Sequence, residues 1–137
     1  MKKDFLVIVR GGGDLATGCI HRLWSAGFKV LVLECAAPAA IRRQVSVCEA
    51  VYEGSNVFEG MTAVLINNVQ EADSVWQAGN VPVLVDETGA CVEELKPDVV
   101  VDAIIAKKNL GTKIDMAPLT IALGPGFEAG VDVDTIV

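Results

Sequence analysis

The feature of this chain that most constrains its fold is a glycine turn between an apolar run and a helix-like stretch. The apolar residues 5–9 lead into Gly11-Gly12-Gly13, and apolar residues then recur at helical spacing from Leu15 until Gly27 stops the pattern. Glycine lets the backbone turn sharply and approach an anion closely, and a helix start presents free N–H groups to that anion. The order strand, turn, helix therefore predicts a phosphate-binding loop.

The turn also fits a dinucleotide fingerprint. The pattern Gly-x-Gly-x-x-Ala begins at Gly11, with alanine as the permitted variant at its last position. Glu34 closes the next strand-like run about 20 residues downstream, where a carboxylate would meet a ribose diol and repel a 2′-phosphate, which favours NAD over NADP. The predicted phosphate contacts are Gly11, Gly12, Gly13, Thr17 and Gly18. The alternative is a turn that only joins strand to helix.

Composition narrows the class of protein. The chain has 137 residues, of which 52% are hydrophobic, so one folded domain over 1–137 is expected. The net charge of −7 argues against a nucleic-acid partner, because phosphate backbones require basic patches. No run approaches the roughly 20 apolar residues of a membrane span. We expect a cytoplasmic protein.

Several strand-like runs are continuously aliphatic, which is typical of a parallel sheet covered on both faces. The runs lie at residues 5–9, 30–33, 46–52, 62–66, 81–85, 99–105 and 119–123, and helices are predicted at 37–43 and 71–78 as well as after the glycine turn. Turn signals within residues 46–66 indicate a small β insertion. The predicted fold class is α/β, a Rossmann-like three-layer domain with a mostly parallel sheet.

A second candidate site follows the most hydrophobic strand. Asp102 interrupts an aliphatic run, so its carboxylate needs a cationic or hydrogen-bonding partner, or a raised pKa. Lys107, Lys108 and Asn109 come next, where open α/β sheets bind ligands, and they are predicted to hold a second anionic group. The alternative is a solvated lysine pair that closes a strand. Arg10, just before the glycine turn, is expected to offset acidic charge there.

Cysteine and histidine usage gives no metal site. The four cysteines form no CxxC pair and His21 is the only histidine, so no metal ligand is predicted. Cys19 and Cys35 are expected to be buried free thiols. Cys91 stands in a polar, turn-like context and is a candidate for an exposed, reactive thiol.

The chain resembles the YqeB-type accessory proteins of selenium-dependent molybdenum hydroxylases. The stretches VIVRGGGDLATGCIHRLWSAGFKVLVLE, PAAIRRQVSVCEAVYEG and VVVDAIIAKKNLGTKIDMAPLTIALGPGFEAGVDVD carry the resemblance. The nucleotide-fold portion of that family is similar to XdhC-type chaperones. The resemblance implies a Rossmann-like core, a role in cofactor maturation and a molybdenum hydroxylase apoenzyme as partner. It also implies that the chain is the N-terminal portion of a longer protein.

Together these observations favour an accessory protein that binds a nucleotide-type small molecule, with molybdopterin dinucleotide or NAD as candidate cofactor. A maturation chaperone is expected rather than a catalyst. One alternative is a small NAD-dependent oxidoreductase, which would need a proton donor that only His21 and Tyr52 suggest. The other is a non-catalytic interaction module on a Rossmann scaffold.

Overall fold

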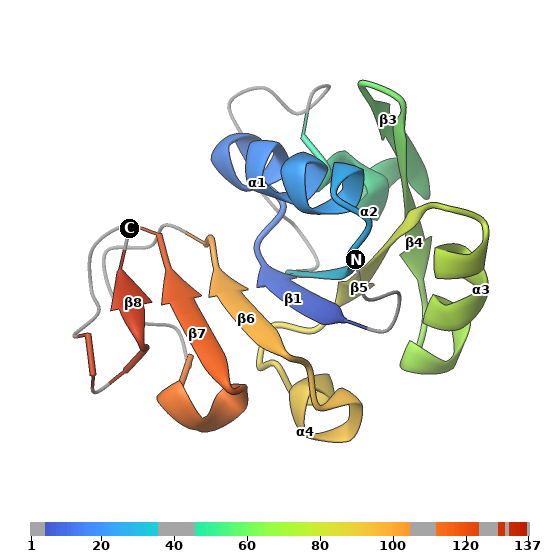
Figure 1. The fold of residues 1–137 in the computed structure, drawn as a ribbon. Helices are drawn as coiled ribbons and strands as arrows, with labels where there is room; N and C mark the ends of the chain where they lie inside the picture. The colour runs from blue at the N-terminus through green and yellow to red at the C-terminus, as the bar shows by residue number, and fades with distance from the viewer. Residues whose placement is uncertain (1–4, 36–45, 105–111, 124–128, 131, 137) are drawn as a thin grey trace.

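A single mixed sheet organises the molecule (Figure 1). The computed structural model describes residues 5–35, 46–104, 112–123, 129–130 and 132–136. Within these residues eight strands lie in the order β3-β4-β5-β2-β1-β6-β7-β8, and all neighbours are parallel except β3 and β4. The strands are β1 (Leu6–Arg10), β2 (Lys29–Glu34), β3 (Ser55–Phe58), β4 (Met61–Ile66), β5 (Val81–Val85), β6 (Val99–Asp102), β7 (Leu119–Ala122) and β8 (Thr135–Ile136).

Helices cover both faces of the sheet. Residues Val7 and Val9 of β1 pack in one core with α1 and α2, while Leu6 and Ile8 pack in a second core with α3 and α4. The helices are α1 (Asp14–Ser25), α2 (Glu49–Glu53), α3 (Ala72–Gln77) and α4 (Cys91–Leu95), with the 3-10 turns η2 (Val69–Glu71) and η3 (Ile114–Met116). The α/β, three-layer, mostly parallel fold predicted from the sequence is confirmed. In the described part of the chain, no helix is long and apolar enough to cross a membrane.

The aliphatic composition of the central strands explains their position. All five residues of β1 are buried, and its neighbours β2 and β6 are nearly as enclosed. Val and Ile side chains suit a pleated surface that is buried on both sides, since their branched Cβ packs well against neighbours. Burial on both faces is why these runs do not alternate with polar residues.

Two local predictions are wrong. Residues 46–52 form no strand, because the chain turns and then enters α2. Val47 and Ala50 are buried, and their spacing of three, extended by half-buried Val51, is helical. The remainder of the 46–66 segment forms the antiparallel β3–β4 hairpin.

Leu15 was expected on the packed side of α1 but is 70% exposed. The predicted helix at 37–43 lies outside the described residues.

Candidate functional site at the carboxyl edge of the sheet

Successive strands are added on one side of β1 and then, from β6 onward, on its other side, and we call the place between β1 and β6 the switch point. From β1 the chain passes to β2 on one side, and β6 and β7 follow on the other side. In open parallel sheets the ligand crevice lies outside the carboxyl ends of the strands at such a point. The glycine turn leaves β1 at this place, so the fold brings it to the expected edge.

A cavity of about 380 Å³ opens at this edge, and we call it the crevice. Its lining comes from the ends of four strands, β1, β2, β5 and β6. The lining residues are Arg10, Gly11, Leu33, Glu34, Cys35, Asp86, Glu87 and Ile104. Three carboxylates, one guanidinium and apolar side chains thus share one small volume. This mixture suits a ligand with hydroxyl groups and a flat apolar part.

Gly11 is required by the backbone at the start of the turn. Its φ is +103°, and a Cβ there would lie 2.9 Å from the carbonyl oxygen of Ala103. Its amide donates a 2.7 Å hydrogen bond to the carbonyl of Leu33. Only glycine combines this conformation with this close approach to the segment after β6.

Gly12 and Thr17 accept hydrogen bonds from backbone amides of residues 46–48. The amide of Cys48 donates to the Gly12 carbonyl at 2.8 Å, and the amide of Val47 donates to the Thr17 hydroxyl at 2.9 Å. The same hydroxyl donates to the Gly13 carbonyl at 2.7 Å and is buried. Thr17 therefore connects the turn to the segment that leads into α2, which is a structural role for a residue predicted to contact phosphate.

Gly13 and Gly18 occupy different surroundings on α1. Gly13 is the N-cap residue and is half-buried, and a Cβ at its position would meet no atom within 4 Å. Gly18 is exposed on the helix, and of the five residues predicted to contact phosphate only Gly11 lines the crevice. The structure therefore brings Gly11, Gly12 and Gly13 together at the helix start and leaves Gly18 apart from them.

Glu34 lies next to the glycine turn, as the fingerprint predicts. One carboxylate oxygen accepts from the Gly12 amide at 2.7 Å, and the other accepts from the Cys35 amide at 2.9 Å. Two backbone donors thereby fix the orientation of this half-buried carboxylate at the wall of the crevice. A carboxylate oriented in advance is suited to accept hydrogen bonds from a vicinal diol.

Asp102 finds the hydrogen-bonding partners that its burial demands. Its carboxylate accepts from the Ile104 amide at 3.1 Å and from the Thr112 hydroxyl at 2.5 Å. Arg10, its register partner on β1, donates to that hydroxyl at 2.6 Å and to the Glu87 carbonyl at 3.0 Å. Sequence reasoning missed the role of Arg10 and of Thr112. The available signal was an arginine at the end of a strand whose other residues are all aliphatic.

The predicted second anion site cannot be placed on this geometry. Lys107, Lys108 and Asn109 lie outside the described residues. The described residues on either side of them, Ile104 and Thr112, are both bound to the Asp102 carboxylate. The position of the three residues relative to the glycine turn stays a prediction.

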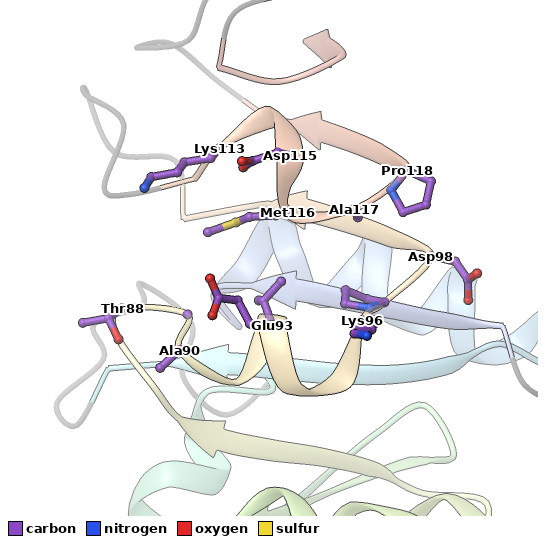
Figure 2. A pocket seen from close by; sticks show the side chains of 13 residues that line it. Thr88, Ala90, Glu93, Lys96, Asp98, Lys113, Asp115, Met116, Ala117 and Pro118 are labelled. Carbon is purple, nitrogen blue, oxygen red and sulfur yellow. The ribbon is translucent and has the colours of Figure 1, made fainter.

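A larger groove of about 840 Å³ lies on the α4 side of the sheet (Figure 2). Figure 2 shows Lys113 and Asp115 on one side of it, and Glu93 of α4 and its C-cap residue Lys96 on the other. None of the residues predicted to bind phosphate or ribose lines this groove. Its mixture of opposite charges gives no preference for an anionic ligand.

The expectation of a reactive Cys91 is wrong. Cys91 is buried, and burial, followed by the hydrogen bond and charge of Asp86, raises the pKa of its thiol to about 12. Burial acts to raise the pKa of Asp86, but hydrogen bonds from Cys91, Ala90 and Thr88 outweigh it and hold that pKa below its usual value. A thiol of this kind is protonated at neutral pH and is a poor nucleophile. In the described residues no cluster of three or more His, Cys, Asp or Glu side chains is arranged to hold a metal ion.

The candidate proton donors of the oxidoreductase alternative lie elsewhere. His21 is 3.1 Å from the Glu59 carbonyl and packs against Phe58, on the α1 side of the hairpin. Tyr52 is on α2 and is 45% exposed. Neither side chain lines the crevice.

Comparison with known proteins finds a related sequence. Over 132 residues, which are 96% of this chain, the sequence is 50% identical to a protein of Escherichia coli (strain K12) described as the uncharacterized protein YqeB. The matched part is 24% of that protein, so the chain spans about a quarter of the length of this curated relative. No protein-family profile and no solved structure matches the chain. The identity over nearly the whole chain supports a relation to YqeB, whose description assigns no activity.

Proposed function

We propose that this domain binds a nucleotide or a dinucleotide-bearing cofactor in the crevice. The observation that carries the proposal is a cavity at the switch point that is lined by Gly11 and by Glu34, whose carboxylate is held by the amide of Gly12. Ligands that contain both a diol and a phosphate fit this combination of groups.

The proposed placement of the ligand follows from the chemistry of each group. A ribose diol donates to Glu34, and the phosphates lie toward Gly13, where the N-terminus of α1 favours negative charge. The acidic lining of the crevice disfavours a further phosphate on the ribose, so NAD is preferred to NADP. Molybdopterin dinucleotide and NAD both offer the required diol and pyrophosphate.

We further propose that the protein is an accessory factor in the maturation of selenium-dependent molybdenum hydroxylases, with the apoenzyme as its partner. The support is the motif resemblance; the relation to YqeB agrees with that resemblance, and its description assigns no activity. A chaperone has to hold and release a cofactor without transforming it. His21 and Tyr52 lie outside the crevice lining, so neither supplies the proton donor that the NAD-dependent oxidoreductase alternative needs there.

The test uses two glycine variants that carry the same new charge. Gly13→Asp places a carboxylate at the N-cap, which stabilises a helix but repels a phosphate at the same amides. Gly18→Asp places it on the exposed side of α1, away from the crevice. Thermal unfolding is recorded with AMP, NAD, NADP, FAD, GTP, CTP and molybdopterin dinucleotides. A ligand at about 100 times its Kd adds about 2.7 kcal/mol to the unfolding free energy.

We expect a shift with at least one ligand that is lost in Gly13→Asp and kept in Gly18→Asp. No shift with any ligand, or a shift of equal size in both variants, would show that the crevice is not a nucleotide site. For the accessory role, the protein is mixed with a purified molybdenum hydroxylase apoenzyme and its cofactor. Unchanged cofactor loading would remove the maturation role while leaving nucleotide binding intact.

A further inference from the structure

A buried polar network is continuous with the wall of the crevice, which Arg10 lines. Arg10 and Asp102 are each 1% exposed and Thr112 is 2% exposed. Burying such charged groups removes them from water, and apolar side chains of similar size often give equal or greater stability. Stability therefore does not account for a guanidinium at this place in an otherwise aliphatic strand.

The contacts of Arg10 reach two segments that come later in the chain. Its guanidinium donates to the Glu87 carbonyl in the turn between β5 and α4, and to the Thr112 hydroxyl before η3. The Thr112 hydroxyl donates in turn to Asp102, whose second oxygen accepts from the Ile104 amide. Glu87 and Ile104 both line the crevice. One side chain thus connects two of its walls to the end of β1.

We propose that Arg10 is a positioning residue that keeps the crevice preformed, and that Asp102 holds it in place through Thr112. This inference rests on the proposed nucleotide function and deepens it. Without the network, the walls at Glu87 and Ile104 have to be ordered when the ligand binds, and that ordering lowers affinity. Arg10 itself does not have to touch the ligand for this effect.

The chain supplies a matched control. Thr112 and Thr120 are both buried threonines whose hydroxyls bind an aspartate, Asp102 in one case and Asp134 in the other. Thr120 lies in β7 and does not line the crevice. Thr112→Val and Thr120→Val remove the same hydroxyl at a buried site, and Arg10→Met removes the guanidinium while keeping an unbranched side chain.

The first measurement is amide hydrogen exchange in the ligand-free protein. The reporters are the amide of Ile104, which donates to Asp102, and the amide of Gly89, which donates to Asp86 in the turn that contains Glu87. We expect Thr112→Val and Arg10→Met to speed exchange at both amides by about tenfold, the effect of losing one hydrogen bond, and Thr120→Val to leave them unchanged. The second measurement is the Kd of AMP and NAD by calorimetry, where the same two variants are expected to weaken binding about tenfold.

The two measurements, hydrogen exchange and calorimetry, distinguish a failure of this inference from a failure of the proposed function. If the wild-type protein binds neither AMP nor NAD, binding of these nucleotides fails as a function, while hydrogen exchange still decides whether Arg10 holds the walls. If the wild-type protein binds and Thr112→Val and Thr120→Val have equal effects on exchange and affinity, the network is only part of the core and the inference is overturned.

Discussion

The carboxylate of Glu34 accepts a 2.7 Å hydrogen bond from the amide of Gly12, which joins the end of β2 to the glycine turn. A second bond, from the Cys35 amide, holds the other oxygen. The residue proposed to bind a ribose therefore also satisfies backbone donors of the ligand-free protein. Ligand affinity and fold stability are linked through one side chain.

Substitution of Glu34 is expected to reduce stability even without ligand. Glu34→Ala leaves the Gly12 amide without its acceptor at a buried position, and the expected loss is about 1–3 kcal/mol. Glu34→Gln keeps a side-chain oxygen that can accept from Gly12, so its loss should be smaller. Urea unfolding of the three proteins measures this difference. Equal stability of Glu34→Ala and wild type would show that water replaces the carboxylate.

The glycines of the turn and of α1 should differ sharply in their tolerance of alanine. Gly11→Ala forces a positive φ on alanine and a contact of 2.9 Å with the Ala103 carbonyl, so we expect a loss above about 2 kcal/mol. Gly18→Ala is exposed inside a helix and should gain about 0.5–1 kcal/mol. Thermal unfolding of both variants is the measurement. A harmless Gly11→Ala would contradict the turn geometry described here.

Thr17 offers a way to separate scaffold from ligand contact. Thr17→Val removes the acceptor for the Val47 amide and should destabilise the protein by about 1–3 kcal/mol, while Thr17→Ser keeps the hydroxyl and should cost less. If Thr17 acts only as scaffold, folded Thr17→Val keeps wild-type affinity for any ligand found, whereas a ligand contact through the hydroxyl would be lost in Thr17→Val and kept in Thr17→Ser. Denaturation and calorimetry on the same preparations give both quantities.

The thiol of Cys91 should resist alkylation in the folded protein. Its pKa of about 12 keeps it protonated at neutral pH, whereas Cys35 lines the open crevice. We expect iodoacetamide to label Cys35 before Cys91, and Cys91 only when the protein unfolds. Mass spectrometry of peptides from briefly treated protein gives the order. Early labelling of Cys91 would show that α4 opens readily.

The raised pKa of the Cys91 thiol also predicts that the protein loses stability in alkali. The folded pKa of Cys91 lies above its ordinary value of 9.0, so its contribution is complete below pH 9.0 and is lost as the pH rises toward about 12. Cys91→Ala should remove this part of the alkaline dependence. Urea unfolding of both proteins on either side of pH 9.0 tests it.

The strands of the sheet could be predicted from the sequence because each one is marked by a pattern of neighbouring residues. Continuous aliphatic runs at β1, β2, β5 and β6 mark strands that are buried on both faces, and the glycine turn marks the start of α1. The error at residues 46–52 arose because a short apolar segment fits both the two-residue period of a strand and the 3.6-residue period of a helix. Tertiary packing of Val47 and Ala50 against the core selected the helix.

The candidate site was only partly predictable. Glu34 and the glycine turn follow from a fixed spacing along the chain. The bond between Arg10 and Thr112 joins residues 102 positions apart, and no local pattern records such a contact. Leu15 was misplaced because the packed face of α1 begins one position later, at Ala16, and continues at Ile20.

The central position of β1 has a consequence for how this protein is made. A chain that emerges from the ribosome at about 5–20 residues per second presents β1 and the glycine turn before the other strands of this sheet. The partners that complete this region come much later, with Cys48, Glu87 and Thr112 following in that order. β1 and the glycine turn are thus synthesised before these partners and are completed only after them. Until β6 has emerged, one edge of β1 has no neighbour, so nascent chains stalled before that point should be the ones most dependent on general chaperones.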